Sequence, residues 1–479
     1  MTFVKSLISR NNTYLNYKIY LFILDTILIV GSFHRSLLMN GYSWGENYGY
    51  IIVIYFVTII SYLYFENYKY KSLKLIREFL VSNIIINIII FGIIALVIFI
   101  TPLGNKIYFI NIFKFYFLIF LAASIIVRVV LFEVIFKSLN KIKALNRNAI
   151  ILGLSEESEK LYDIREDIRI NNGLEIIGFV RIDKSGRSKN SKYTILGHID
   201  NIFDLSNKYN FKDIFLVNSN LSTDKLIKII ENLRSYNFLL HVGADNLKEL
   251  FKANLFDVYG TESKFIDFSI NRFYYKKYLK VVLDYFFAIL FLIIISPLFL
   301  IFLILIKSTS DGPALFIGER IGLSQKKFNV FKFRSMKHNV AENIEFHKAN
   351  IEPFYTGKKS GEIKKYNSSS RVTNVGRILR RHSLDELPQF INILFRNMSV
   401  IGPRPCMDYE LKYFKGWKKY RFNVQPGITG LWQVYGRSKV NFEGMSIFDY
   451  YYHSNCSLTL DIKIAFDTIR VLIFGIGGY

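Results

Sequence analysis

The stretch VVLDYFFAILFLIIISPLFLIFLILI occupies residues 281–306 and is apolar apart from Asp284. It is longer than the ~20 residues with which a helix crosses the ~30 Å hydrocarbon core of a bilayer. Basic residues flank it on both sides, with Arg272, Lys276, Lys277 and Lys280 before it and Lys307, Arg320, Lys326 and Lys327 after it. A true crossing would put one of these clusters on the outer side, against the positive-inside rule. The stretch therefore predicts a membrane segment that leaves by the side from which it entered.

Ser296 and Pro297 lie in the middle of this stretch and mark the predicted membrane break. Proline has no backbone N–H, and its ring clashes with the carbonyl four residues earlier, here that of Ile293. The Ser296 hydroxyl is able to bond a carbonyl that the proline leaves without its helical partner. The alternative is a kinked helix that crosses the membrane, which would put everything after Lys307 outside the cell.

Four more apolar runs lie upstream, at about residues 19–38, 48–65, 78–101 and 107–132. Each has about the length of a membrane span. Lys and Arg are frequent before the first run, between the second and third, and after the fourth, whereas the other two loops carry only Glu46 and Lys106. The positive-inside rule then places both ends of a four-helix transmembrane bundle in the cytoplasm. Asp25 lies inside the first run, where a functional role and contact with partner helices both remain open.

The chain of 479 residues is both apolar and basic. Its 51% hydrophobic residues exclude a disordered, collagen-like or coiled-coil protein. The 62 Lys and Arg against 38 Asp and Glu leave a net charge of +24, which indicates an anionic partner such as nucleic acid, anionic lipid or a phosphorylated substrate. With only Cys406 and Cys456, neither a disulfide framework nor a zinc cluster is expected. No cleavable signal peptide is predicted, because the first apolar run lacks a small-residue cleavage pattern.

Residues 148–251 alternate between short β-rich runs and amphipathic, charged segments, which predicts a parallel α/β domain of Rossmann type. The first run, Ala149–Leu152, leads into Gly153-Leu-Ser-Glu-Glu-Ser158. A dinucleotide site needs later glycines there, and Glu156 and Glu157 would repel a pyrophosphate. We therefore favour a regulatory or scaffolding domain, with cofactor binding as the alternative. The absence of a Tyr-x-x-x-Lys pair argues against a sugar-nucleotide dehydratase or epimerase.

The segment Phe328-Asn-Val-Phe-Lys-Phe-Arg-Ser-Met336 follows the membrane stretch. In a strand, Lys332 and Arg334 would share one face, and Phe331 and Phe333 the other. This arrangement would make a cationic strip over an apolar backing, and the alternative is an ordinary solvated strand face.

Two adjacent carboxylates, Asp385 and Glu386, follow a basic segment. The basic residues are Arg371, Arg377, Arg380, Arg381 and His382. Ser383 and Glu386 have the spacing of a capping box, which is the structural alternative. Pro388 instead favours a helix that begins there, with both carboxylates at or just before an N-terminus that attracts negative charge. Because neighbouring side chains point in different directions, the two carboxylates suit two roles, with one attacking phosphorus and the other holding a metal or moving a proton.

Downstream, Arg404 lies between two prolines, which hold a guanidinium suited to phosphate on a stiff backbone. Pro426-Gly427 is the signal for a type II turn. Trp432 is suited to stack on a base or a sugar, and packing in the core is the alternative. The aromatic stretches Phe414–Tyr420 and Phe448–Tyr452 fit either the membrane interface or the core.

Residues 280–479 closely resemble the bacterial sugar transferases, the monotopic polyprenyl-phosphate hexose-1-phosphate transferases. Five motifs in this order carry the resemblance: Ser296-Pro297, Lys332-Phe-Arg-Ser-Met336, Ser383-Leu-Asp-Glu-Leu-Pro-Gln389, Gly402-Pro-Arg-Pro405 and Gln425-Pro-Gly-Ile-Thr-Gly-Leu-Trp-Gln433. The upstream spans and the α/β domain look like the long form of this family, with a weaker resemblance. The glycine-poor loop at Gly153 departs from more glycine-rich relatives and puts a nucleotide role of that domain in doubt.

The resemblance implies transfer of a hexose 1-phosphate from a UDP-sugar to undecaprenyl phosphate with release of UMP. In such enzymes this reaction starts capsule, exopolysaccharide or O-antigen synthesis. By position, Asp385 is implied as the nucleophile of a covalent aspartyl-phosphosugar intermediate and Glu386 as its assistant, with Mg²⁺ as cofactor and both carboxylates as its ligands. Substrate binding is assigned by the same resemblance to Lys332, Arg334, Arg380, Arg404, Gln389 and Gln433.

The implied architecture combines membrane helices with α/β domains. Residues 1–140 would form the four transmembrane helices, 141–262 a Rossmann-like cytoplasmic domain, 263–306 a linker with the re-entrant membrane helix, and 307–479 a small α/β-type catalytic domain. The implied location is the bacterial inner membrane, with the catalytic domain facing the cytoplasm. The implied partners are undecaprenyl phosphate, a UDP-hexose, inner-membrane lipid, a second copy in a homodimer and later glycan-assembly enzymes.

Two other classes of protein stay open as hypotheses. A non-catalytic membrane scaffold or regulator of glycan assembly would keep the fold and need neither carboxylate. A nucleic-acid binder would use the net positive charge, but the basic residues are spread over loops and the aromatic residues lie in apolar runs, so nucleic acid is not an expected partner. The identity of the sugar cannot be assigned to any residue.

Overall fold

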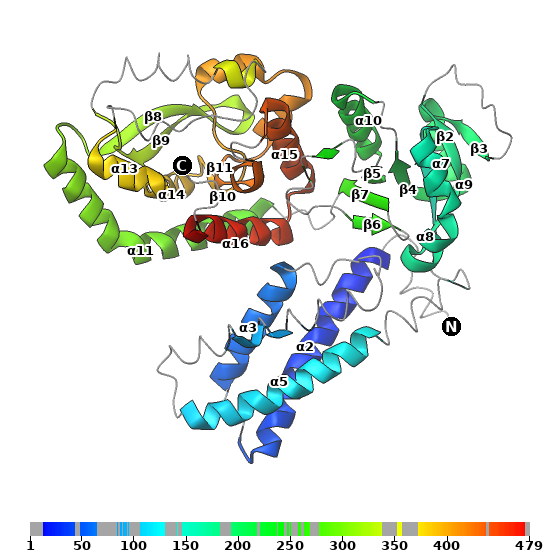
Figure 1. The fold of residues 1–479 in the computed structure, drawn as a ribbon, viewed down its shortest axis with the longest axis horizontal. Coiled ribbons are helices and arrows are strands. Elements are labelled where there is room, and N and C mark those ends of the chain that lie inside the picture. The colour runs from blue at the N-terminus through cyan, green and yellow to red at the C-terminus, as the bar shows by residue number, and fades with distance from the viewer. Residues whose placement is uncertain are drawn as a thin grey trace. The chain divides into compact units, whose positions relative to one another are not determined.

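The computed structural model describes residues 13–43, 48–64, 106–129, 146–182, 193–217, 221–236, 238–243, 257–259, 263–268, 277–337, 352–356, 372–436 and 440–474, with scattered positions at 84–94, 141 and 247–250. The chain forms two compact units, drawn as a ribbon in Figure 1. The first unit contains residues 1–220, 238–243 and 256–267, and the second contains residues 221–237, 244–255 and 268–479.

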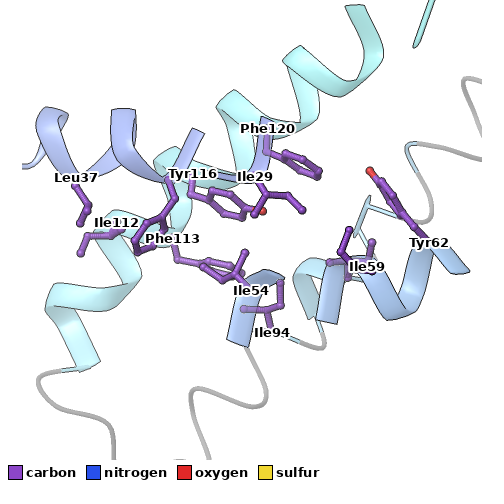
Figure 2. Packing of buried hydrophobic residues seen from close by; sticks show 12 residues of the cluster. Ile29, Leu37, Ile54, Ile59, Tyr62, Ile94, Ile112, Phe113, Tyr116 and Phe120 are labelled. Carbon is purple, nitrogen blue, oxygen red and sulfur yellow. The ribbon is translucent and has the colours of Figure 1, made fainter. Parts of the chain in front are cut away.

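Three apolar helices begin the first unit: α2 (Thr13–Met39), α3 (Tyr48–Tyr64) and α5 (Lys106–Val129). They share one buried cluster, in which Ile29 of α2, Ile54 of α3 and Tyr116 of α5 take part (Figure 2). Within α2, Phe22–Met39 is long and apolar enough to cross a membrane, whereas the apolar parts of α3 and α5 are shorter.

These three helices coincide with the first, second and fourth predicted runs. The third run, at 78–101, lies largely outside the described residues, so the four-helix bundle stays a prediction. Asp25 is only 2% exposed in α2. Its burial agrees with the alternative in which this carboxylate faces neighbouring helices.

A sheet with a parallel majority makes up the rest of the first unit. Its order is β3-β2-β1-β4-β5-β7-β6, in which β1 to β5 pair in parallel and β6 with β7 antiparallel. The strands are β1 (Arg147–Leu152), β2 (Leu174–Arg181), β3 (Ile195–His198), β4 (Phe211–Leu216), β5 (Leu239–Gly243), β6 (Asp257–Tyr259) and β7 (Ser263–Phe268). The connecting helices are α7 (Glu156–Asp163), α8 (Arg165–Asn172) and α9 (Ile202–Tyr209), with the short turn η2 (Ile199–Asn201). The predicted parallel α/β arrangement is confirmed.

The loop after β1 is organised as a helix cap. Gly153 has a φ of +94°, which favours glycine, and the Ser155 hydroxyl accepts a hydrogen bond from the Ser158 N–H at 3.2 Å. The first turn of α7 then carries Glu156 and Glu157. The N-terminus of this helix is thus complemented by its own carboxylates.

A buried ionic cluster lies inside this sheet. His241 of β5 lies 3.0 Å from a carboxylate oxygen of Asp213 and 2.6 Å from one of Asp267. Burial by itself lowers the pKa of His241, but the charge of Asp267 and hydrogen bonds to both carboxylates outweigh it and raise the pKa to about 9. At neutral pH the imidazolium therefore offsets the negative charge buried around it.

The membrane stretch of the second unit forms the helix α11 (Lys277–Thr309), with Pro297 in its interior. The Ser296 hydroxyl donates to the Ile293 carbonyl at 2.8 Å, as the sequence predicts. Figure 1 shows that the helix is bent along its length. An interior proline is a recognised cause of such a bend.

One face of α11 packs against the rest of the second unit, and the other is apolar and exposed. Ala288 and Ile306 are buried at 0% and 1% exposure, whereas Ile294 and Ile304 are 66% and 67% exposed. Among the described helices, α11 is the second that is long and apolar enough to cross a membrane. Together, α2 and α11 indicate association with a membrane.

The remainder of the second unit mixes short strands and helices. The hairpin of β8 (Leu315–Ile321) and β9 (Lys327–Phe333) is joined by η4 (Leu323–Gln325), and β10 (Ser399–Ile401) pairs in parallel with β11 (Gly427–Thr429). The helices and helical turns are α10 (Thr223–Ser235), α13 (Asn374–Arg381), η5 (Leu384–Glu386), α14 (Gln389–Leu394), η6 (Asp408–Tyr413), η7 (Gly416–Asn423), η8 (Trp432–Gly436), α15 (Phe442–Asn455) and α16 (Leu458–Phe474).

Both aromatic stretches of this unit lie in its core. Phe414 is 1% exposed, Phe448 is 0% exposed and Tyr450 is 2% exposed. Trp432 packs against the same aromatic cluster as Phe414. The core alternative is therefore confirmed for the two stretches and for Trp432.

Candidate active site

The adjacent carboxylates lie in the turn η5, between α13 and α14. Thr373 is the N-cap of α13, because its hydroxyl accepts a hydrogen bond from the Gly376 N–H at 2.9 Å. Helix α14 begins at Gln389 with Pro388 as its N-cap, one residue after the predicted start. Ser383 has a φ of +54° and makes no side-chain cap, so the capping-box interpretation is wrong.

Glu386 is held by two cations from separate segments. Its Oε1 atom accepts from Nζ of Lys332 on β9 at 2.7 Å and from a guanidinium nitrogen of Arg404 at 3.2 Å. The Glu386 side chain is 14% exposed. Charge-assisted hydrogen bonds of this kind are stronger than neutral ones, so they fix the relative positions of the three side chains.

The charges around Glu386 shift the pKa values of its neighbours. Burial lowers the pKa of Lys332, and the charge of Glu386 offsets part of that effect. The same carboxylate raises the pKa of Arg404 above its usual range. Burial lowers the pKa of Arg380, while the charge of Asp385 acts in the opposite direction. The charges of Arg380 and Asp385 therefore interact with each other.

Close backbone packing fixes the segment that carries Arg404. A Cβ atom on Gly402 would lie 2.2 Å from the Gln425 carbonyl oxygen, and one on Gly427 would lie 2.0 Å from the Gly402 nitrogen. Only glycine fits these two positions, because side chains would separate the strands β10 and β11. Arg421 also donates a hydrogen bond to the Arg404 carbonyl, and it forms an ion pair with Asp449 at 3.4 Å.

A small hollow opens beside this cluster. It is lined by Arg320, Val330, Lys332, Glu386, Gln389, Arg404, Pro405, Gly427, Ile428 and Gln433. Three cations and one carboxylate among these residues leave a local charge of +2. Such a hollow favours a ligand with about two negative charges, such as a diphosphate diester.

The structure brings together five of the six predicted substrate-binding residues. Lys332 and Arg404 contact Glu386, Gln389 and Gln433 line the same hollow, and Arg380 lies near Asp385. The sixth, Arg334, lies past the end of β9 and donates to the Ser310 carbonyl at 2.8 Å and to the Asp311 carbonyl at 2.6 Å. It thus satisfies carbonyls at the end of α11 and does not line the hollow.

Arg320 is a site residue that the sequence interpretation missed. Its strand β8 pairs antiparallel with β9, so that Arg320 faces Phe328 and Phe316 faces Lys332. Residues two apart on one strand share a face, and this register places Arg320 on the same face as Lys332. The basic residue in Phe316-Ile-Gly-Glu-Arg-Ile-Gly322 was a signal, but only the strand pairing shows where it points.

The second half of this chain is similar to a known protein family. Residues 275–475 match the family described as Bacterial sugar transferase. An exopolysaccharide production protein ExoY of Sinorhizobium fredii is 40% identical over 198 residues, which cover 41% of this chain and 86% of that protein. The chain belongs to the bacterial sugar transferase family.

Two longer relatives of this sugar transferase match over a smaller share of their length. The undecaprenyl-phosphate galactose phosphotransferase of Salmonella typhimurium is 39% identical over 203 residues, or 42% of each chain. The UDP-glucose:undecaprenyl-phosphate glucose-1-phosphate transferase of Klebsiella pneumoniae is 39% identical over 188 residues, which cover 38% of this chain and 37% of that protein.

Arg320 offers a direct test of the charge of the hollow in this sugar transferase. We expect Arg320→Gln to weaken the binding of inorganic pyrophosphate about tenfold, or by about 1.4 kcal/mol, because one cation facing the anion is lost. Isothermal titration of the detergent-solubilised protein measures this affinity. Arg377→Gln, an exposed residue of α13 outside the hollow, should leave it unchanged. Equal affinities for wild type and Arg320→Gln would contradict the assignment.

Proposed function

We propose that this protein transfers a hexose 1-phosphate from a UDP-sugar to undecaprenyl phosphate and releases UMP. The observation that carries the proposal is a hollow with a local charge of +2 that Glu386, the sequence neighbour of Asp385, helps to line. A UDP-sugar carries one negative charge on each of its two phosphates. These two negative charges match the local charge of +2 in the hollow. Exopolysaccharide, capsule or O-antigen synthesis is the pathway class that fits this reaction.

The names of the relatives support the lipid acceptor and the transferred group. The Salmonella and Klebsiella relatives are both named for transfer to undecaprenyl phosphate, one with galactose and the other with glucose. The sugars differ while the lipid phosphate is shared. The proposal therefore covers the acceptor and the phosphosugar, without naming one hexose.

In the proposed reaction Asp385 acts as the nucleophile. Its carboxylate oxygen attacks the β-phosphorus, and the bond from that phosphorus to the oxygen bridging to UMP breaks, so UMP leaves with the electron pair. An oxygen of undecaprenyl phosphate then attacks the aspartyl-phosphosugar and releases the Asp385 carboxylate. Covalent catalysis divides one difficult displacement into two easier ones.

The basic residues of the site would act on the charge of the transferring group. Phosphoryl transfer depends mainly on positioning and on cations that neutralise charge at the phosphate oxygens. Lys332, Arg404 and Arg320 line the hollow where the diphosphate would bind, and Arg380 would face Asp385. Glu386 would hold Lys332 and Arg404 in position and assist as a metal ligand or proton acceptor.

A magnesium ion fits the donor set of this site. No group of three His, Cys, Asp or Glu side chains gathers among the described residues, which disfavours an all-protein cage. Mg²⁺ is commonly held by one or two carboxylates together with substrate phosphates, and Asp385 and Glu386 would supply the carboxylates. When bound, the ion would neutralise phosphate charge.

The contacts of α11 support a helix that enters and leaves the same leaflet. Near its start, Lys280 forms an ion pair with Asp461 at 2.5 Å, and near its end Ile306 packs in one cluster with Phe333. The helix therefore touches the unit that carries the charged site along most of its length. A straight crossing would pull that unit into the hydrocarbon core, which buried charges strongly oppose. A bent helix with its apolar face in the lipid would leave the hollow at headgroup level, where the lipid phosphate and a cytoplasmic UDP-sugar meet.

The central test uses purified protein in detergent with Mg²⁺, undecaprenyl phosphate and a panel of UDP-sugars. We expect UMP release with at least one sugar, and a loss of ~10³-fold or more in Asp385→Asn, because the amide is not a nucleophile. Chelation should abolish release, and added Mg²⁺ should restore it. Asp408→Asn, an exposed carboxylate paired with Lys327, is the matched control and should keep its rate.

Release that survives Asp385→Asn would sink the covalent mechanism. No release with any sugar, together with normal glycan synthesis in cells that carry only Asp385→Asn, would instead favour the non-catalytic scaffold.

Single cysteines at the two ends of α11 test its path. Tyr278, which is 82% exposed, and Ser308 would each be replaced by cysteine, and the native Cys406 and Cys456 are buried. We expect a membrane-impermeant maleimide to label both positions in inside-out vesicles and neither in intact cells. Labelling of one position in each preparation would show a crossing.

A further inference from the structure

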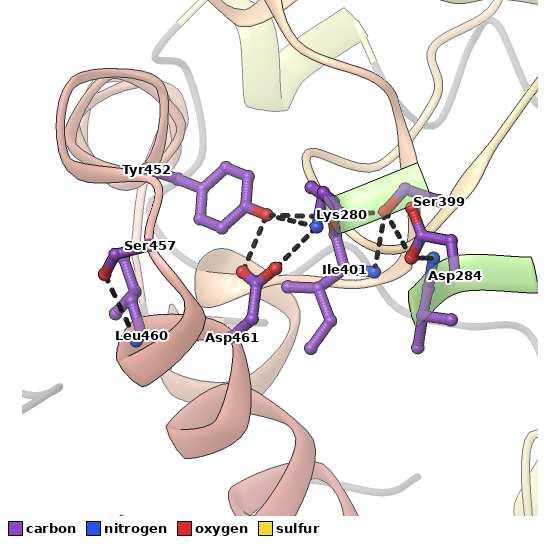
Figure 3. A network of polar contacts seen from close by, with 9 residues as sticks. Lys280, Asp284, Ser399, Ile401, Tyr452, Ser457, Leu460 and Asp461 are labelled. Atoms are coloured by element: carbon purple, nitrogen blue, oxygen red, sulfur yellow. Dashed lines mark hydrogen bonds and ion pairs between the residues drawn. The ribbon is translucent and has the colours of Figure 1, made fainter. Parts of the chain in front are cut away.

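A polar network buried in the second unit ties the first turns of α11 to α15 and α16 (Figure 3). Nζ of Lys280 lies 2.5 Å from Asp461 and donates to the Tyr452 hydroxyl at 3.2 Å. The Tyr452 hydroxyl in turn lies 2.8 Å from the other oxygen of Asp461. Tyr452 is 2% exposed and Asp461 is 6% exposed, so these two members of the network are buried.

The same turns of α11 also hold the strand β10. Oδ1 of Asp284 accepts from the Ser399 hydroxyl and from the Val400 N–H, both at 3.0 Å. The Tyr452 hydroxyl also lies 2.9 Å from the carbonyl oxygen of Ile401, so its one hydrogen is shared between this carbonyl and Asp461. Every residue of this three-residue strand is therefore held by the network.

Strand β10 runs directly into the segment that carries Arg404. Only Gly402 and Pro403 separate Ile401 from Arg404, and the Gly402 N–H donates to the Thr429 carbonyl at 2.8 Å. Proline fixes its φ, and the glycine contact leaves no room for adjustment, so a displacement of β10 passes to Arg404. The Arg404 guanidinium is the group that contacts Glu386 at 3.2 Å.

Packing alone does not account for this choice of residues. Burying an ammonium and a carboxylate costs free energy, and an apolar cluster of the same volume often stabilises a fold as well or better. Directional hydrogen bonds instead specify where the bonded groups lie. The acceptor at one end of this network is the Ile401 carbonyl, three residues from a site arginine.

We propose that Tyr452, together with Lys280, Asp461 and Asp284, is a positioning residue that sets Arg404 against Glu386 through β10. The membrane helix is then a structural part of the reaction site as well as an anchor. This inference rests on the proposed function, because its effect is read in the transfer reaction.

The experiment compares two tyrosines of the same helix. Tyr452→Phe removes only the hydroxyl that reaches Ile401, and Tyr450→Phe is the matched control, since its hydroxyl donates to the Glu231 carboxylate at 2.6 Å. Both variants remove a buried hydroxyl that bonds a carboxylate, so both should lower Tm, and Tyr452→Phe should lower it more because Lys280 and Ile401 also lose a partner. We expect Tyr452→Phe to lower kcat for UMP release by three- to tenfold with less than a twofold change in KM, and Tyr450→Phe to keep kcat.

A double-mutant cycle tests whether Arg404 carries the effect. On an Arg404→Lys background, which already displaces the guanidinium, Tyr452→Phe should cost less than twofold. A full three- to tenfold loss on that background would overturn the proposed route. Equal kcat values for Tyr452→Phe and Tyr450→Phe would overturn the inference while leaving the proposed function intact, whereas absence of UMP release by the wild type would count against the function itself.

A second pair of variants covers the case in which Tyr452→Phe does not fold. Asp284→Asn keeps an oxygen that accepts from Ser399 and Val400, and Asp284→Ala removes it. We expect the asparagine variant to keep kcat within twofold and the alanine variant to lose three- to tenfold. Equal kcat values in these two folded variants would overturn the inference.

Discussion

The ion pairs of Glu386 with Lys332 and Arg404 are the constraint on which the site depends. They join three segments that are far apart in the sequence: the strand β9, the turn η5 and the loop after β10. Half-buried charges of opposite sign hold one another in place because leaving any one of them without its partner is costly. The cluster still has a net positive charge, so it binds its own carboxylate and remains attractive to an anion. That combination suits a site for phosphate transfer.

The second constraint is the two-faced character of α11. One face supplies Ala288 and Ile306 to the cores that support β9, α13 and α14, and the other exposes isoleucine and leucine. In a membrane, that exposed face would contact lipid, and the proposed path of the helix would keep Asp385 and Glu386 beside the headgroups. The two proposed substrates differ greatly in polarity, since one is a water-soluble nucleotide sugar and the other a long isoprenoid phosphate. A site at the interface is the place where both can reach one nucleophile.

Much of this arrangement could be predicted from local sequence patterns, and the remainder depends on pairing over long distances. Strand periodicity predicted the side of β9 that carries Lys332 and the side that carries Phe333, and Phe333 does pack against α11. The same periodicity misjudged the surroundings of Arg334, because β9 ends at Phe333 and the next side chain turns to the end of α11. Arg320 was missed because its position follows from the register of β8 with β9. The pairing of Lys280 with Asp461 spans 181 residues, and no local pattern indicates it.

The central claim is that the phosphosugar is carried on Asp385 between donor and acceptor. The most direct measurement incubates the wild-type protein with a UDP-sugar and Mg²⁺ in the absence of undecaprenyl phosphate, quenches it in acid and maps its peptides by mass spectrometry. We expect a phosphosugar adduct on Asp385 with an equivalent of UMP, and loss of the adduct when undecaprenyl phosphate is added before quenching. UMP release that requires both substrates at once, with no adduct at any time, would contradict it.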